Sequence, residues 1–213
     1  MSDQPIAMVC FDLGGVMIRL CKSWAHACEK AGVRVPAALS DASCMQHFRD
    51  TCIPNEIGIT SQEDVCDVAG WLFGLDAGVV HEITSAYLDG KYEGIEDLIG
   101  ELKLAGIKTA CLSNTNDNHW QIMNGGEGEN ALPLDALDHR FASHLVRDRK
   151  PNPSFFRNVE RETGLEAGQI LFFDDALINV RAARRCGWQS EQVTDQEDPV
   201  GMMRRMLCEK GIL

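Results

Sequence analysis

The chain has 213 residues, of which 45% are hydrophobic and 24% charged, and its formal net charge is −12. This length and composition are typical of an ordinary globular protein with one sizeable α/β domain, or with a core domain and a small insert. The acidic excess argues against nucleic-acid binding, because Lys and Arg must neutralise the phosphates there. No apolar run approaches the roughly 20 residues that span a bilayer, so we expect no membrane partner.

Nine cysteines are present, an odd number, and none forms a C-x-x-C pair. The pattern predicts neither a zinc cluster nor a thioredoxin-like redox site. The N-terminal stretch lacks a basic leader followed by an apolar run and a cleavage site, so we expect no signal peptide. Free thiols together with this N-terminus favour a reducing, cytoplasmic location.

Short apolar runs that stop at polar or glycine residues predict buried strands. Three clear runs cover residues 6–11, 107–112 and 170–173, and two weaker ones cover 141–146 and 189–193. Helical patterns between them cover residues 93–105, 153–163 and 179–185. Strands that alternate with helices predict the α/β class, with a Rossmann-like parallel sheet and helices on both faces.

Residues 18–90 interrupt this alternation and show no convincing strand. Helical patterns cover 24–31, 42–52, 61–73 and 77–88, with Thr60 and Glu63 as a capping box before the third. An insert directly after the first strand would lie over the carboxyl ends of the sheet, where such folds bind ligands. We therefore predict a core of residues 1–17 and 91–213 and a helical cap of residues 18–90 that acts as a lid.

The first polar cluster is Asp12-Leu13-Gly14-Gly15, which directly follows the first predicted strand. A carboxylate at a strand end can attack phosphorus and form an aspartyl-phosphate. The glycines allow backbone amides to approach a phosphate closely. Taken alone, the same string also fits a strand-terminating turn with a solvated Asp12.

Two further clusters follow the strands predicted over 107–112 and 141–146. Ser113 and Asn114 offer a hydroxyl and amides that can donate to a phosphate oxygen, although such residues also form turns and helix caps. Lys150 precedes Pro151, which keeps it out of a helix. An ammonium there can balance the charges of a nucleophile and a phosphate; without other site residues it would be an ordinary surface lysine.

The fourth cluster is Asp174-Asp175, at the end of the strand predicted over 170–173. Two adjacent carboxylates repel each other and usually need a cation. With oxygen ligands alone, the natural choice is Mg²⁺.

The order and spacing of Asp12, Ser113, Lys150-Pro151 and Asp174-Asp175 resemble the four motifs of the haloacid dehalogenase superfamily. The resemblance extends over the whole chain, since residues 18–90 match that family's bundle-type cap. Ser113-Asn114-Thr115-Asn116 with His119, and Ser143-His144 before Lys150, are most similar to the branch that contains bacterial sugar-1-phosphate phosphatases.

The resemblance implies a magnesium-dependent phosphatase of a small phosphorylated metabolite, with a sugar phosphate as one option. In this scheme Asp12 is the nucleophile, Lys150 steadies the developing charge, and Ser113, Asn114, Gly14 and Gly15 bind the substrate phosphate. Mg²⁺ is held by Asp12, the Gly14 carbonyl, Asp174 and Asp175. Positioning and charge stabilisation of this kind account for most of phosphoryl-transfer catalysis.

One position departs from the family pattern. Most family phosphatases carry a second Asp two residues after the nucleophile as general acid and base, and here that residue is Gly14. A proton-transfer role of this kind is worth roughly 10²–10⁴-fold in rate. His119 and His144 are candidate replacements, although each also fits a structural role, and Arg19 is either a surface residue or a contact for an anionic substrate group.

Two alternatives follow from this departure. A catalytically weak or inactive relative that works by binding would also lack the acid at Gly14. A metal-free 2-haloacid dehalogenase lacks it too, but it has no use for Asp174 and Asp175, because it attacks carbon.

Overall fold

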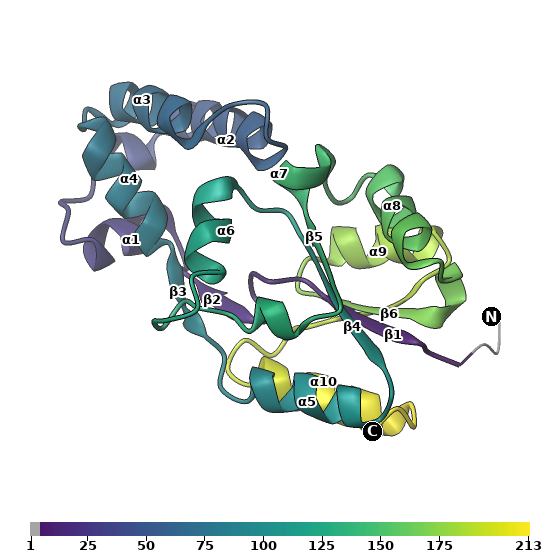
Figure 1. Cartoon of the computed structure of the whole chain (residues 1–213). Helices are drawn as coiled ribbons and strands as arrows, with labels where there is room; N and C mark the ends of the chain where they lie inside the picture. The colour runs from purple at the N-terminus through teal and green to yellow at the C-terminus, as the bar shows by residue number, and fades with distance from the viewer. Residues whose placement is uncertain (1–4) are drawn as a thin grey trace.

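A computed structural model describes residues 5–213, and its centre is a five-stranded parallel sheet (Figure 1). The strand order is β5-β4-β1-β6-β7. The strands are β1 (Met8–Phe11), β4 (Lys108–Ser113), β5 (His139–Ala142), β6 (Ile170–Asp174) and β7 (Gln189–Gln192). Every residue of β1 is buried, because this strand pairs with a neighbour on each side and helices cover both faces. The predicted fold class is confirmed.

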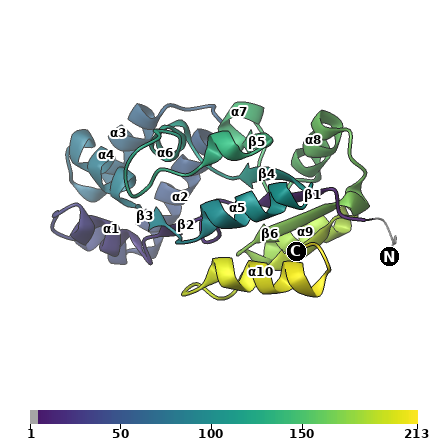
Figure 2. The same cartoon turned by 60° about the horizontal axis from the view of Figure 1, so that its bottom comes forward.

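Helices pack on both faces of the sheet (Figures 1 and 2). α5 (Ile95–Leu104) and α10 (Pro199–Glu209) cover one face, and α8 (Pro153–Thr163) and α9 (Leu177–Arg185) cover the other. Successive side chains of a strand point to opposite faces. Val9 and Phe11 accordingly pack in the first apolar layer, and Met8 and Cys10 pack in the second.

Two short helices begin at the carboxyl edge of the sheet. α6 (Asp117–Met123) follows β4, and the Asn116 side chain caps it by accepting a hydrogen bond from the His119 amide at 2.9 Å. α7 (Ser143–Val146) follows β5. Single 3₁₀ turns occur at Ala37–Ser40, Leu134–Ala136 and Ala167–Gln169.

Four helices between β1 and α5 form a bundle beyond the carboxyl ends of the strands (Figure 1). They are α1 (Trp24–Lys30), α2 (Ala42–Glu56), α3 (Gln62–Phe73) and α4 (Ala77–Ala86). The bundle has its own apolar core around Phe48, Val65 and Val80. The Trp24 ring lies 4.7 Å from that of Phe48 and 4.6 Å from that of Tyr87. We refer to this bundle as the cap.

The expectation that residues 18–90 hold no strand is wrong. β2 (Ile18–Leu20) and β3 (Leu88–Lys91) form an antiparallel pair where the chain enters and leaves the cap. Three and four residues are too few to show an alternating pattern, and Arg19 and Leu20 are exposed. The pair is specified by the meeting of two distant chain segments rather than by either one alone.

Other boundaries shift because local chemistry decides them. The strand expected over 141–146 ends at Ala142, and Ser143 begins α7. The capping box before α3 uses Ser61 and Asp64, one residue beyond the predicted pair. The sequence patterns did not predict α10.

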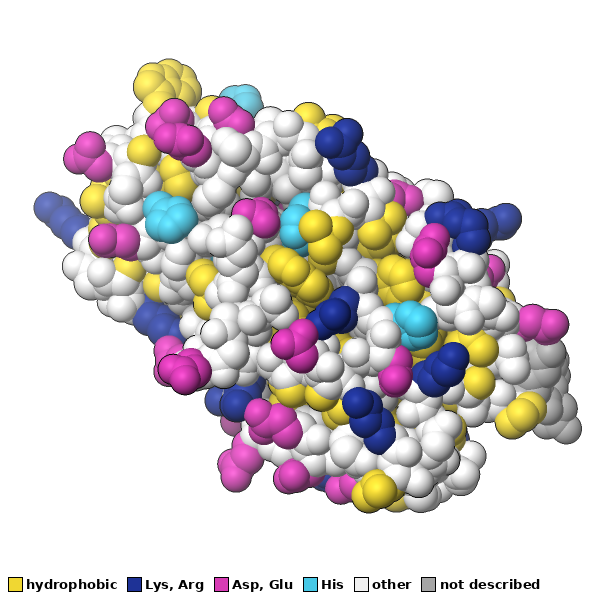
Figure 3. All heavy atoms as spheres, viewed as in Figure 1, with side chains coloured by type: hydrophobic (Ala, Val, Ile, Leu, Met, Phe, Trp, Pro, Cys, Tyr) yellow, Lys and Arg dark blue, Asp and Glu magenta, His cyan; other side chains and the backbone are white. Residues whose placement is uncertain are grey.

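None of the helices in residues 5–213 combines the length and the apolar character that a membrane crossing requires. On the face in Figure 3, acidic and basic side chains are interspersed, and no wide basic patch appears. All nine cysteines are free thiols.

Candidate active site

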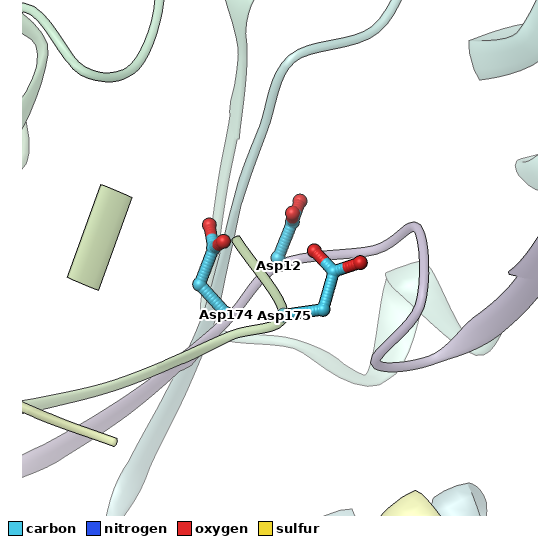
Figure 4. Close-up of side chains that lie close together, drawn as sticks. All are labelled: Asp12, Asp174 and Asp175. Carbon is cyan, nitrogen blue, oxygen red and sulfur yellow. The ribbon is translucent and has the colours of Figure 1, made fainter. Parts of the chain in front are cut away.

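Three carboxylates meet at the carboxyl edge of the sheet (Figure 4). β1 and β6 are parallel neighbours with Phe11 opposite Phe173, so Asp12 and Asp174 follow at the same level. One oxygen each from Asp12, Asp174 and Asp175 lies within 4.8 Å of the others. The topology therefore brings together two of the predicted clusters, which stand about 160 residues apart in the sequence.

Lys150 lies between two of these carboxylates. Its ammonium nitrogen is 2.8 Å from Asp12 Oδ1 and 2.7 Å from Asp174 Oδ2, and its side chain is 1% exposed. A buried ammonium is stable only when it is paired in this way. The sequence-based prediction that Lys150 accompanies Asp12 thus has a direct geometric counterpart.

Asn114 holds the Lys150 backbone from both sides. Its Oδ1 accepts from the Lys150 amide at 2.9 Å, and its Nδ2 donates to the Lys150 carbonyl at 2.9 Å. Both functional atoms of the Asn114 side chain are therefore occupied in positioning Lys150. The predicted contact between Asn114 and a substrate phosphate is left to its backbone amide and stays a prediction.

The adjacent acids Asp174 and Asp175 differ in their surroundings. Asp174 is fully buried and accepts hydrogen bonds from Lys150, from the Ala176 amide at 2.8 Å and from Asn179 Nδ2 at 3.1 Å on both oxygens. The Asp175 carboxylate accepts no hydrogen bond from another side chain in residues 5–213. The backbone amides of Asp175 and Ala176 interact with this carboxylate. Asp175 is thus the less engaged of the two acids toward a cation, and Asp174 chiefly holds Lys150 in place.

Burial dominates the electrostatics of this cluster. It raises the pKa of Asp12 to about 7, although the Lys150 ammonium opposes the shift. It raises the pKa of Asp175, and the neighbouring Asp174 charge adds to the effect. Burial alone would lower the pKa of Lys150, but the charges of Asp12 and Asp174 outweigh it and raise that pKa. Three acids facing one ammonium leave an excess of negative charge that a divalent cation would neutralise.

The structure accounts for the two glycines after Asp12, Gly14 and Gly15, in different ways. Gly15 has φ +69°, and a Cβ there would lie 2.5 Å from Asp175 Oδ2, so only glycine leaves room for that carboxylate. Its amide donates to the Ile18 carbonyl at 2.8 Å. Gly14 lies outside the left-handed region, and its Cβ would meet the Leu20 side chain at 2.8 Å. Phosphate binding by Gly14 and Gly15 stays a prediction.

A cavity of about 400 Å³ lies between the cap and the carboxyl edge of the sheet. Gly14, Ser113 and Asn114 form part of its floor. The Ser113 hydroxyl makes no hydrogen bond with another residue of the described chain, so it is available to a ligand. A cavity of this size lies within the range of small-molecule sites, roughly 300–1,000 Å³.

His119 and His144 have structural partners. His119 lines the cavity, and its Nε2 lies 2.7 Å from the Thr84 carbonyl of the cap; burial lowers its pKa despite that bond. His144 Nδ1 lies 3.2 Å from the Thr115 carbonyl, and burial lowers its pKa as well. Both are therefore neutral near pH 7, a poor state for a general acid.

Arg19 lies outside the cavity wall. It donates to the Asp89 and Lys91 carbonyls, and its guanidinium stacks 4.9 Å from the centre of the Tyr92 ring. These contacts tie β2 to β3 and account for Arg19 without a substrate.

Sequence patterns missed one ion pair at this site. Glu56, the last residue of α2, lies 2.9 Å through Oε2 from Nη2 of Arg149, and both residues line the cavity. The position of Arg149 directly before Lys150 is the one signal in the sequence that places it near the site. No local pattern marks Glu56, because cap packing brings it there.

The geometry agrees with the comparisons. Residues 6–187 match the family model of haloacid dehalogenase-like hydrolases, and the chain belongs to this family. A family enzyme of Bacteroides thetaiotaomicron has a TM-score of 0.81 at 21% identity, over 94% of this chain and 100% of that one. An L-2-haloacid dehalogenase of Xanthobacter autotrophicus has a TM-score of 0.63 at 21% identity, over 98% and 84%. At these identities the likeness concerns the fold alone.

Two curated relatives match part of the chain. Protein CbbY of Cereibacter sphaeroides is 32% identical over 95 residues, which are 44% of this chain and 40% of that protein. A sesquiterpene phosphatase of Aspergillus oryzae is 31% identical over 98 residues, or 46% and 48% of the two chains. The matched segments thus span less than half of each relative.

Proposed function

We propose that this protein is a magnesium-dependent phosphatase that hydrolyses small phosphate monoesters through an aspartyl-phosphate at Asp12. The observation that carries the proposal is the buried Lys150, held between Asp12 and Asp174 with Asp175 beside them. A nucleophilic carboxylate, a fixed cation and a metal-binding acid are the groups that phosphoryl transfer requires.

The donor set fits Mg²⁺. Asp12, Asp174 and Asp175 offer oxygen atoms only, and Gly15 keeps space for the Asp175 carboxylate. The Gly14 carbonyl is proposed as a further ligand. A bound Mg²⁺ would neutralise charge on the phosphate oxygens and let two anions, the nucleophile and the substrate, approach each other.

The residues of the chain divide the remaining work. Asp12 attacks phosphorus and displaces the alcohol, and water then attacks the aspartyl-phosphate to release inorganic phosphate. Lys150 stabilises the charge that develops on the transferring group, and the Ser113 hydroxyl donates to one of its oxygens. Asn114 and Asp174 keep Lys150 in place through both reactions.

The cavity favours an ester whose alcohol portion is largely apolar. Its core side includes Ser113 and its polar neighbours, and its cap side includes a group of apolar side chains, Trp24, Phe48, Ile53 and Val65. A relative named as a sesquiterpene phosphatase supports this direction. Arg49, Asn55 and Gln62 also lie on the cap side, so the apolar part of the alcohol would contact the portion of the wall around Trp24, Phe48 and Val65.

The first experiment measures phosphate release from a panel of monoesters with excess EDTA and with millimolar Mg²⁺. We expect turnover only with Mg²⁺, and none from Asp12→Asn, because a neutral amide cannot form the acyl-phosphate. Asp67→Asn, on an exposed face of α3, is the matched control. Turnover by Asp12→Asn at the wild-type rate would exclude the covalent route.

The second experiment compares n-butyl and n-hexyl phosphate with glucose 6-phosphate. Each buried methylene contributes about 0.8 kcal/mol, which corresponds to a roughly 4-fold rise in kcat/KM per CH₂. Ile53→Ser should reduce this rise, whereas Ile59→Ser, also exposed but outside the cavity, should leave it unchanged. A preference for glucose 6-phosphate would contradict the apolar assignment and leave the phosphatase assignment intact.

A 2-haloacid dehalogenase is the second candidate function, because one of the structurally similar proteins is an L-2-haloacid dehalogenase. Asp174 and Asp175 favour the phosphatase, since attack at carbon needs no metal site. Halide release from 2-chloropropionate without Mg²⁺ would reverse this choice.

A further inference from the structure

We propose that Glu56 of the cap supplies the proton to the leaving alcohol and later takes one from the hydrolytic water. This inference rests on the proposed phosphatase function and adds the residue that replaces the missing acid at Gly14. Glu56 is the last residue of α2, and the cap's packing on the core brings its carboxyl group to the wall of the cavity that Gly14 and Ser113 also line.

Two contacts fix this end of α2 on the core. Gly58 lies so close to α7 that a Cβ there would be 2.4 Å from the His144 carbonyl oxygen. The Glu56 carboxylate lies 2.9 Å from Arg149, which is the residue before Lys150. The carboxyl group is therefore held beside the loop that carries Lys150, whose ammonium group lies against Asp12.

The contact between Glu56 and Arg149 is an ion pair without hydrogen-bond geometry. Glu56 Oε2 and Arg149 Nε are both buried, and neither makes a hydrogen bond within residues 5–213. A buried polar atom without a partner is costly unless a ligand or water satisfies it. The Glu56 side chain as a whole is 27% exposed, so the carboxyl group is also accessible to a leaving-group oxygen in the cavity.

The electrostatic surroundings favour proton exchange. Burial raises the pKa of Glu56, while the charges of Arg149 and Lys150 oppose the shift. Cys52 on the same helix is neutral, since burial raises its pKa to about 12, and His144 on the adjoining α7 is neutral near pH 7. A carboxyl pKa that lies closer to neutrality suits a group that must both donate and accept a proton.

The other groups on the cavity wall are less suited to this role. His119 is neutral and bonded to the Thr84 carbonyl, and Arg49 and Arg149 carry no removable proton near neutral pH. Tyr87 is a weaker acid, and burial raises its pKa further.

The proton balance is closed. In the first step the Asp12–phosphorus bond forms, the bond from phosphorus to the ester oxygen breaks, and the Glu56 carboxyl proton passes to that oxygen. In the second step the Glu56 carboxylate removes a proton from water as the water oxygen bonds to phosphorus and the Asp12–phosphorus bond breaks. The products are the alcohol and inorganic phosphate, and Glu56 is again protonated.

The test measures kcat/KM of wild type, Glu56→Gln and the control Glu63→Gln for n-hexyl phosphate and p-nitrophenyl phosphate with Mg²⁺. Glu63 lies on an exposed face of the cap, outside the cavity. We expect Glu56→Gln to lose about 10²-fold or more on the alkyl ester, whose leaving group needs a proton, and less than about 10-fold on the aryl ester. Glu63→Gln should match wild type on both.

A purely structural role of Glu56 predicts a different pattern. Arg149→Met breaks the same ion pair but keeps the acid, so it should not reproduce the selective loss on the alkyl ester. It should move the high-pH limb of the alkyl rate to higher pH, since it removes a charge that lowers the Glu56 pKa, whereas Glu56→Gln should abolish that limb. If Glu56→Gln is unstable, Glu56→Asp, which retains the carboxyl group, should keep the limb.

Equal losses on both esters, or an Arg149→Met variant with the same selective loss, would overturn the role of Glu56 while leaving the phosphatase proposal in place. If wild-type protein binds Mg²⁺, as measured by calorimetry, but hydrolyses neither ester, both the role of Glu56 and the phosphatase proposal would be overturned.

Discussion

Replacing Lys150 by Met removes one charge from the most buried ion pair of the structure and keeps a side chain of similar length. Lys150 and Asp174 are 1% and 0% exposed, and Asp12 is the second partner. Lys91→Met is a matched control: its nitrogen lies 2.6 Å from Glu96, but the two side chains are 36% and 51% exposed. If only the distance mattered, the Lys91–Glu96 pair would be the stronger of the two ion pairs. If burial matters, it is the weaker.

The magnitudes differ accordingly. Removing one partner of a buried pair costs about 3–5 kcal/mol, because the other charge stays buried without compensation. An exposed pair contributes about 0–1 kcal/mol. For a chain of this size 1 kcal/mol corresponds to roughly 2–4 °C in Tm. Lys150→Met should therefore lower Tm by about 6–20 °C, and Lys91→Met by about 4 °C or less.

The loss should also grow as pH rises through 7. Burial raises the pKa of Asp12 to about 7 in the folded protein, against about 3.9 unfolded, and Lys150 opposes that rise. Without Lys150 the folded pKa lies higher still, so the folded variant binds more protons than the unfolded chain, and its stability falls as pH increases. Calorimetry and urea unfolding at pH 6 and 8 measure this. Equal losses for the Lys150 and Lys91 variants would refute the reasoning.

Two further predictions concern single positions. Gly15→Ala should weaken Mg²⁺ binding by about 10-fold or more in calorimetry, because the added Cβ would displace Asp175. Gly126 has a similar positive φ and open space around it, so Gly126→Ala should leave the affinity unchanged. Equal affinities of the two variants would contradict this prediction. The folded pKa of His119 lies below its unfolded value, so wild type should lose up to about 1.4 kcal/mol per pH unit as pH falls below about 6.5. His119→Gln, which keeps a donor for the Thr84 carbonyl, should lack that term in urea unfolding, and an unchanged pH slope would argue against it.

The sheet and the residues at its edge could be predicted from the sequence because their signals are local. An apolar run such as 170–173 that stops at Asp174-Asp175 predicts both the strand and the polar residues at its carboxyl end. A parallel sheet then places all such ends on one edge. This is why Asp12 and Asp174 could be grouped from positions far apart in the chain, whereas Lys150, which lies beyond α7, is grouped with them by the resemblance to the family motifs.

The remaining features depend on contacts that no local pattern contains. β2 and β3 are short strands that exist because they pair with each other. The Asn114 side chain serves Lys150 rather than the cavity, a choice made by the loop geometry. Glu56 reaches the site only because the cap packs on α7, so its spacing in the sequence from Asp12 carries no information.

The structure shows that a side chain at position 14 would be crowded by its surroundings. The space where a side chain at that position would begin is filled by Leu20, whose Cδ1 would lie 2.8 Å from the added Cβ. Leu20 and Glu56 line the same cavity. An apolar side chain beside the nucleophile cannot deliver a proton, so a reaction with a poor leaving group must obtain it from another part of the wall. In the proposed mechanism, the position of the cap over the sheet determines whether the proton donor Glu56 is present at the site.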